Sequence, residues 1–263
     1  YTYNDKYLVT LTGRIDQDSR FGPDNRTGYF PSAAVAWRLS KEKFFNVSWI
    51  NDLKLRASYG KLGFSDVLGS WDYLGLLNNN PRAVYGVGQT PIVGEYQAQI
   101  ANSDLRWETR IQKNIGFDAN LFDNTVSLSA DVYNSLSKDV LVQLPLGQYL
   151  GSTGLPSANA GSIKNTGVEI DATYRNNKKA LAWDISANVT TIKNRVVSVG
   201  NQGVDVEGNK VNYIEPTNFL RAQVGHSIGE WYVIKTDGIF QSQEEINKYT
   251  NKSGTVIQPG AKP

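Results

Sequence analysis

The feature that most constrains this chain is a period-two alternation of apolar and polar side chains, repeated in long runs. Between Val126 and Tyr133, every second residue is aliphatic and the residues between them are Ser, Asp or Tyr. Because successive side chains of a β-strand point to opposite faces, such a run predicts a strand with one apolar and one polar face. Seven clear runs occupy residues 7–16, 32–39, 53–59, 107–121, 126–133, 168–174 and 181–190. A weaker eighth run lies near 231–240, and the clearest helical pattern is short, at 243–248.

Alternation of this kind fits two architectures. A soluble β-sandwich buries its apolar face against a second sheet, whereas a membrane barrel turns that face to lipid and its polar face to a hydrated lumen. The seven clear runs extend over 7–15 residues, around the ~9–11 of a tilted membrane strand and above the ~5–6 of globular strands. The polar faces also carry carboxylates that would need partners in a protein core. They are Asp118, Asp131, Glu169, Asp171 and Asp184.

Connection lengths favour the barrel. Phe122-Asp123-Asn124 and residues 175–179 form tight turns, and the long connections at 60–106, 134–165 and 195–230 alternate with them. Outer-membrane barrels show this pattern, with short periplasmic turns and long outer loops. We therefore predict an all-β, antiparallel transmembrane β-barrel segment of about seven or eight strands. Loops this long are typical of plugged barrels of roughly 22 strands.

Composition agrees with this interpretation and excludes several others. The chain has no Cys, so it offers no disulfide, thiolate metal site or Cys nucleophile. A net charge of +2 gives no reason to expect nucleic acid. Because the chain begins at Tyr1 and ends at Pro263 without an obvious final element, we expect 1–263 to be part of a longer barrel protein, with its plug domain and both natural termini absent.

Aromatic residues near the strand ends could form interfacial girdles, although each could equally be ordinary packing. These residues are Tyr7, Trp37, Tyr59, Trp107, Tyr174 and Trp183.

An ordered set of short strings resembles one family of barrel proteins. The strings include Asp18-Ser19-Arg20-Phe21-Gly22-Pro23, Gly28-Tyr29-Phe30-Pro31-Ser32, Trp49-Ile50-Asn51-Asp52-Leu53, Leu105-Arg106-Trp107-Glu108, Asn114-Ile115-Gly116-Phe117-Asp118, Asn165-Thr166-Gly167-Val168-Glu169 and Asp237-Gly238-Ile239-Phe240-Gln241. In this order they resemble the C-terminal half of the barrel of SusC/RagA-type TonB-linked outer-membrane proteins of Bacteroidota. Each string alone is weak, and the match covers almost the whole chain.

The resemblance implies an importer in the cell outer membrane, in contact with outer-membrane lipid, that is not an enzyme and uses no cofactor. Its plug would be moved by TonB, and a SusD-like surface lipoprotein would cover its outer mouth. The ligand would be an oligosaccharide or a peptide. We expect no metal site and no nucleic-acid partner.

Three aromatic residues in the long connection at 60–106 are the predicted ligand contacts: Trp71, Tyr73 and Tyr85. Aromatic faces stack on sugar rings, and neighbouring Asn side chains both donate and accept hydrogen bonds. The alternative is that these aromatics pack the loop onto the barrel or onto the lid protein.

Other candidate chemistry is weaker. Glu169 and Asp171 share one strand face at roughly the spacing of glycosidase carboxylates, but two lumen-facing polar residues would look the same. The remaining candidates, in sequence order, are Asp16, Asp18 and Asp24 as a calcium loop, Gly86-Val87-Gly88 as a phosphate loop, and His226 as a triad member. Their spacings match none of these sites.

Two rival functions stay open. The first is a soluble β-sandwich that binds or cleaves carbohydrate, which would remain in solution without detergent. The second is a structural or adhesive barrel without transport, which would lack a plug and a TonB box.

Overall fold

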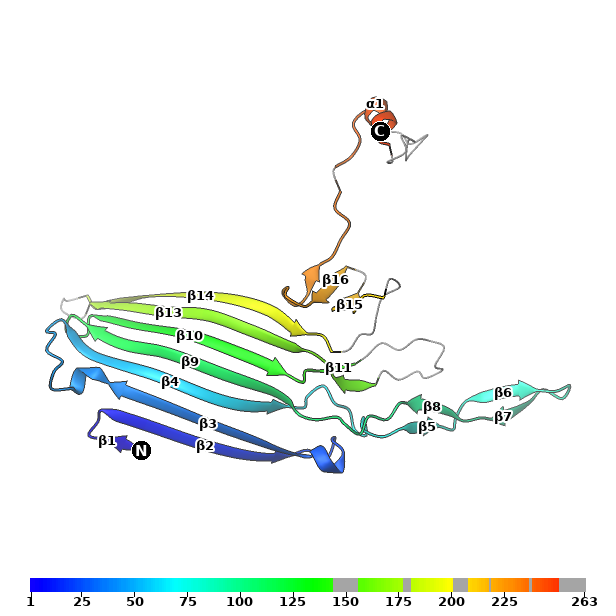
Figure 1. Cartoon of the computed structure of the whole chain (residues 1–263), viewed down its shortest axis with the longest axis horizontal. Coiled ribbons are helices and arrows are strands. Elements are labelled where there is room, and N and C mark those ends of the chain that lie inside the picture. Colours follow the sequence, from blue (N-terminus) through cyan, green and yellow to red (C-terminus); the bar gives the residue numbers. More distant parts are fainter. Residues whose placement is uncertain (144–155, 177–180, 201–207, 218, 237, 251–263) are drawn as a thin grey trace.

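The computed structural model describes residues 1–143, 156–176, 181–200, 208–217, 219–236 and 238–250 (Figure 1). Its centre is an eight-stranded antiparallel sheet in the order β1-β2-β3-β4-β9-β10-β13-β14. The strands of this sheet are β1 (Thr2–Tyr3), β2 (Tyr7–Gln17), β3 (Thr27–Arg38), β4 (Ile50–Phe64), β9 (Glu108–Leu121), β10 (Val126–Lys138), β13 (Ser162–Asn176) and β14 (Trp183–Ser198). Each long strand therefore pairs with the next long strand along the chain. The short strands β5–β8 and β11–β12 lie in the connections between long strands and form separate small sheets.

The smaller elements lie in the connections. They are the 3-10 turns η1 (Pro23–Asn25) and η2 (Leu39–Lys41), the strands β5 (Leu76–Asn78), β6 (Arg82–Tyr85), β7 (Thr90–Val93), β8 (Tyr96–Gln99), β11 (Leu141–Gln143), β12 (Ser157–Asn159), β15 (Tyr213–Thr217), β16 (Leu220–Gln223) and β17 (Glu230–Trp231), and the helix α1 (Gln243–Lys248). Strands β5 and β8 pair, as do β6 and β7, so the connection from β4 to β9 extends outward as a two-part ribbon (Figure 1).

Long and short connections lie at opposite ends of the sheet, as predicted (Figure 1). The turn between β9 and β10 is tight because Phe122, Asp123 and Asn124 all have positive φ, between 52° and 62°. Positive φ matches the twist of an antiparallel hairpin. The predicted turn at 175–179 includes residues outside the described part of the chain, as does the connection at 195–230. Below, the end that carries β5–β8 is called the outer end.

All seven clear alternating runs lie on the seven long strands of the sheet, which confirms them. The predicted eighth strand at 231–240 is wrong. Among the described residues of that run, strand pairing is confined to Trp231, which belongs to β17 (Glu230–Trp231) and pairs with β16. The described residues that follow leave the sheet toward α1 and have no neighbouring strand to supply ladder hydrogen bonds (Figure 1). The eighth strand of the sheet is instead β1.

The predicted helix at 243–248 is confirmed as α1. The hydroxyl of Ser242 caps it by accepting a hydrogen bond from the backbone N–H of Glu245. In the described ranges there is no helix that combines the length and the apolar character needed to span a membrane.

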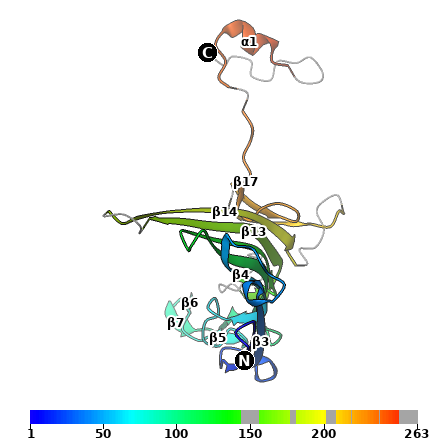
Figure 2. The same cartoon turned by 90° about the vertical axis from the view of Figure 1, so that its left-hand side faces the viewer.

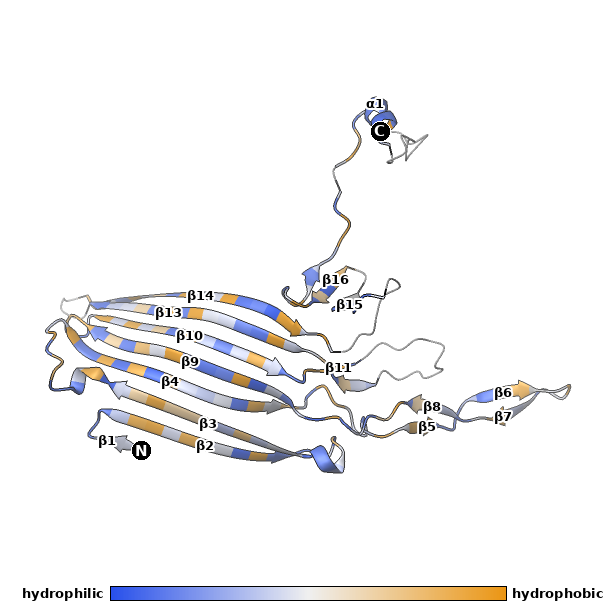
Figure 3. Ribbon diagram, viewed as in Figure 1, coloured by the Kyte–Doolittle hydropathy of each residue, from blue (hydrophilic) through white to orange (hydrophobic). Residues whose placement is uncertain are grey.

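One face of the sheet is apolar and exposed. Val132 lies opposite Ile115 on β9 and opposite Val168 on β13, so aliphatic side chains align across strands. Leu11 and Ile115 are 76% and 70% exposed. Figure 3 shows hydrophobic and hydrophilic residues alternating along each strand, and Figure 2 shows the sheet curving from β14 through β4 to β3. A sandwich would bury this face, whereas a barrel would turn it to lipid. We call it the outward face, and the opposite one the polar face.

Aromatic pairs occur at the end of the sheet opposite the outer end. Trp49 stacks on Phe122 with ring centroids 5.7 Å apart, and Tyr174 lies 5.3 Å from Trp183. This placement agrees with an interfacial girdle. Trp107 does not belong to such a girdle, because it packs inside the outer loops, 5.0 Å from Phe21.

The one cluster of buried apolar residues among the described residues lies at the base of the outer loops. Phe21, Leu68, Leu105 and Leu141 come from three different connections and are each at most 5% exposed. The outer loops therefore have a core of their own, while the sheet carries no core on either face.

Candidate functional site

The polar face carries a cross-strand ionic network. The Arg56 guanidinium on β4 lies 2.9 Å from a carboxylate oxygen of Asp118 on β9 and 2.9 Å from one of Asp131 on β10. Lys54 adds a second cation 2.8 Å from Asp118. The Ser129 hydroxyl also donates to Asp118 at 3.1 Å. The network is half-buried and joins three strands that lie up to 75 residues apart in sequence.

Gly116 makes this network possible. The register places it on β9 between Arg56 and Asp131, so the arginine must cross its position to reach the third strand. A Cβ at Gly116 would lie 2.3 Å from Asp131 Oδ1 and 2.6 Å from the Ala130 carbonyl oxygen. Both distances are far below van der Waals contact. Because Gly116 has no side chain, the Asp131 carboxylate can occupy the space beside it and reach Arg56.

Two further carboxylates lie beside the network on β13. Glu169 is in register with Asp131, and Asp171 with Ser129. Both are exposed, and neither pairs with another described residue. An acid/base pair needs two carboxyl groups in different environments, one more buried than the other. Glu169 and Asp171 are both exposed, so their environments do not differ in this way. Their position fits lumen-facing polar groups, with hydrogen-bonding capacity left for water or a passing ligand.

A second polar network holds the base of the outer loops. Arg20 binds Asp18 with N–O distances down to 2.6 Å, and its guanidinium also donates to the Ser65 hydroxyl and the Leu68 carbonyl. The hydrogen bond from Arg20 lowers the pKa of Asp18 to about 2, against the opposing effect of burial. Because Asp18 and Ser65 precede different loops, this network fixes one loop against the other.

Aromatic packing supports the same region. The Trp107 indole donates to the Arg26 carbonyl at 3.2 Å and lies between Phe21 and Phe30, with centroids 5.0 and 5.4 Å away. Asp72, whose carboxylate accepts a hydrogen bond from the Ser157 hydroxyl at 2.7 Å, joins the first long loop to a later one. Hydrogen bonds and aromatic contacts thus hold the outer connections against one another at the outer end of the sheet.

Comparison with known proteins assigns this architecture. Residues 1–260 match the family described as TonB dependent receptor-like, beta-barrel. The chain belongs to the TonB-dependent receptor β-barrel family. The resemblance found in the sequence strings is therefore confirmed.

Several relatives of this barrel are known by sequence. TonB-dependent receptor P3 of Formosa agariphila is 33% identical over 249 residues, covering 92% of this chain and 24% of that protein. TonB-dependent receptor SusC of Bacteroides thetaiotaomicron is 31% identical over 272 residues, covering 100% of this chain and 27% of that protein. The chain thus spans about a quarter of the length of these curated relatives.

Solved structures show the same fold. The RagAB peptide importer in its closed-closed state superposes with a TM-score of 0.72 and 25% sequence identity, covering 85% of this chain and 23% of the solved chain. A second structure of the RagAB peptide transporter has a TM-score of 0.71 and 26% identity.

The three predicted ligand residues are not brought together in this receptor barrel. Tyr73 is half-buried against the loop-base cluster. Trp71 is 56% exposed and has a positive φ of 74°, which is unusual for a bulky residue. Tyr85 ends β6 in the outermost hairpin, and its side chain lies outside the described part (Figure 1). Their role as ligand contacts stays a prediction.

The other candidates have ordinary structural settings. Asp18 is bound to Arg20, and Asp16 lies 2.7 Å from Arg14. The described ranges contain no group of three or more potential metal-ligating side chains. His226 is exposed and lies 3.0 Å from Glu230. Residues 86–88 belong to the turn of the β6–β7 hairpin, and the Asp237 string begins outside the described residues.

The ionic network was missed at the level of sequence, although its members were present in the predicted strands. The available signal was Gly116 itself, because a glycine inside a strand marks a close approach. Which residue approaches it could not be read from the sequence, since that depends on the register between β4, β9 and β10.

Proposed function

We propose that this chain forms part of the wall, lumen surface and outer loops of a TonB-dependent importer in the outer membrane. The observation that carries the proposal is the division between the two faces of the sheet: an exposed aliphatic face and a polar face with a half-buried ionic network. Lipid on one side and water on the other is the environment in which both faces are stable.

The mechanism needs no covalent chemistry. A ligand captured at the outer loops would enter a lumen that is closed by a plug and opened when TonB acts on that plug. A SusD-like lipoprotein would cover the outer end of the barrel. The carboxylates of Glu169 and Asp171, which pair with no other described residue, provide polar groups along such a route together with the network of Arg56.

The ligand class is an oligosaccharide or a peptide. The RagAB relatives are named as peptide importers or transporters, which supports a peptide, and the sequence relative SusC is compatible with either class. We propose Trp71, Tyr73 and Tyr85 as ligand contacts in the outer loops. Trp71 is exposed, whereas Tyr73 is half-buried.

Fractionation and growth test the proposal. The intact receptor should sediment with outer membranes and require detergent for extraction. Deletion of either the TonB system or the lid lipoprotein should abolish growth on the cognate oligosaccharide or peptide. Extraction in buffer alone would favour a soluble sandwich, and unchanged uptake in both deletions would refute the import mechanism.

A further inference from the structure

The outward face carries cations but no anions. Its basic residues on the seven long strands are Lys61, Lys113, Lys138, Lys164, Lys193 and Arg195. All acidic residues of these strands alternate onto the polar face instead. Five of the six basic side chains are exposed, Lys61 is half-buried, and none of them pairs with another described residue. We call this set the basic band.

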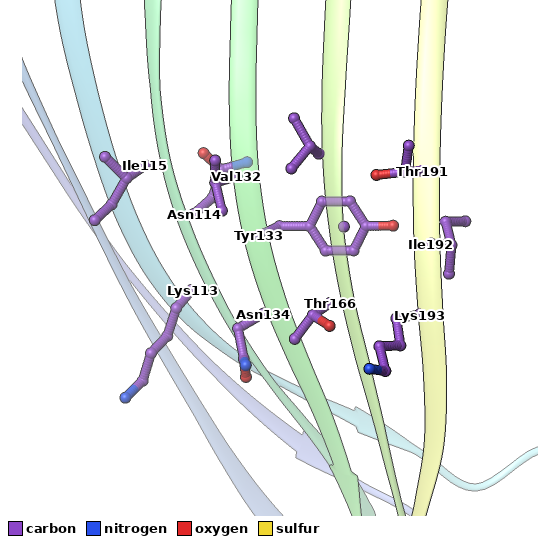
Figure 4. A pocket seen from close by; sticks show the side chains of 12 residues that line it. Lys113, Asn114, Ile115, Val132, Tyr133, Asn134, Thr166, Thr191, Ile192 and Lys193 are labelled. Carbon is purple, nitrogen blue, oxygen red and sulfur yellow. The ribbon is translucent and has the colours of Figure 1, made fainter. Parts of the chain in front are cut away.

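The basic band occupies three successive outward-facing rows in the half of the sheet nearer the outer end. Lys113 and Lys193 occupy one cross-strand row with Asn134 and Thr166 between them. Figure 4 shows these four side chains along a line, next to the aliphatic Ile115 and Val132. The remaining members lie further along their strands toward the outer end. The outward face therefore changes from aliphatic to basic where the outer loops begin.

The cations of the band are close enough to repel one another. Lys164 lies directly opposite Arg195 on the neighbouring strand, and like charges in that position destabilise a sheet. Lys193 is two residues from Arg195 on the same face, roughly 7 Å along the strand. Repulsion of this kind strengthens where lipid lowers the local dielectric constant. An anion seated among these side chains would reverse the sign of the interaction.

We propose that the basic band binds the phosphorylated headgroup of a lipid in the outer leaflet. This inference rests on the membrane placement proposed above. Lysine and arginine side chains near the end of a membrane-spanning element extend to the interface, and phosphate oxygens accept strong charge-assisted hydrogen bonds from them. Asn134 and Thr166 add neutral donors to the same row, and the aliphatic rows below it match the acyl chains of such a lipid.

Lipid retention by the intact receptor tests this assignment. The receptor is purified in neutral detergent and titrated with lipid A that carries its phosphates, and bound lipid is counted by native mass spectrometry. The Lys164→Gln/Lys193→Gln/Arg195→Gln variant should bind this lipid about tenfold more weakly than the wild type. Dephosphorylated lipid A should bind both proteins weakly and equally.

A matched control removes the same charge elsewhere. Lys41, Lys43 and Arg82 are exposed, lie off the outward face and pair with no other described residue, so their triple Gln variant should retain lipid like the wild type. The single Lys193→Gln variant, with an expected loss of a few-fold, keeps the test open if the first variant does not fold.

Three outcomes would overturn the assignment. The first is equal binding of phosphorylated lipid A by the wild type and the basic-band variant. The second is binding of dephosphorylated lipid A by the wild type that is as tight as its binding of the phosphorylated form. The third is full competition by equimolar inorganic phosphate, which would indicate a free-anion site. A receptor that sediments with outer membranes while giving any of these results would leave the importer proposal intact. A receptor that fails to sediment there would refute the importer proposal itself.

Discussion

Replacing Gly116 by alanine adds a single methyl group at the crossing point of the ionic network. That methyl would lie 2.3 Å from Asp131 Oδ1 and 2.6 Å from a backbone oxygen. The carboxylate has to rotate away from Arg56 and the backbone has to shift. Overpacking of this kind costs ~1–3 kcal/mol, and loss of a half-exposed ion pair adds about 1 kcal/mol.

The chain offers a matched control in Gly13 on β2, where an added Cβ has no atom within 4 Å. Any Gly→Ala change also reduces the entropy of the unfolded chain, which favours folding by ~0.4–1 kcal/mol. That gain is common to both variants and cancels between them. The free energy of unfolding of Gly116→Ala should therefore fall below that of Gly13→Ala by ~2–4 kcal/mol, the sum of the two costs.

Guanidinium unfolding of the intact receptor in detergent measures this difference as a shift in midpoint at constant slope. A second variant isolates the cause. In an Asp131→Ala background the carboxylate is gone, so Gly116→Ala should cost less than it does in the wild type. Equal midpoints for the two glycine variants would show that Arg56 does not need the gap at Gly116, and the account of the network would fail.

Further predictions concern the outer loops. The pKa of Asp18 is about 2 in the folded protein and 3.8 in the reference state. Because the folded value is the lower one, the stabilisation by Asp18 is complete above pH ~4 and is lost as the pH falls toward 2. Digestion by an acid protease should therefore accelerate at the loops over that interval, and the Asp18→Asn variant should lack the transition. Phe21→Ala should cost ~3–5 kcal/mol locally, since Phe21 is 0% exposed, and should open the loops to proteolysis at neutral pH with the sheet intact. Trp71→Ala should weaken ligand binding several-fold without changing the unfolding midpoint, and an unchanged affinity would remove Trp71 from the proposed contacts.

Alternation predicted which segments form strands better than it predicted the residues at which those strands end. The run at 126–133 became β10 (Val126–Lys138), which continues past the last aliphatic residue of the run. The reason is that ladder hydrogen bonds extend a strand wherever the partner is already in place, whatever the side chains are. The run at 231–240 shows the converse, because its alternation produced a strand only at Trp231, which has β16 as a partner, and none at the other described residues of the run.

The functional surfaces were predictable only in part. That Arg56, Asp118 and Asp131 share the polar face follows from periodicity alone. That they meet in one network depends on the pairing of β4 with β9, across 43 intervening residues at 65–107 that contain two hairpins. The partial burial of Tyr73 against the cluster of Phe21, Leu68, Leu105 and Leu141 depends on the same long-range closure. Loop residues that contact one another through such closure leave no periodic signal in the sequence.

The ionic network also helps to explain how a wall without a core keeps its register. A slip by one residue between β4 and β9 would turn every side chain of one strand to the opposite face. Arg56 would then point into lipid, where an unpaired guanidinium costs at least ~2.5–3.5 kcal/mol, and Asp118 would lose both of its cations. A slip by two residues would keep the faces but move Gly116 away from the path of Arg56. The aliphatic outward face disfavours a one-residue slip, which would turn polar side chains to lipid. It does not disfavour a two-residue slip, because one aliphatic row resembles the next. The network penalises both, so the polar face contributes specificity that the lipid-facing side cannot supply.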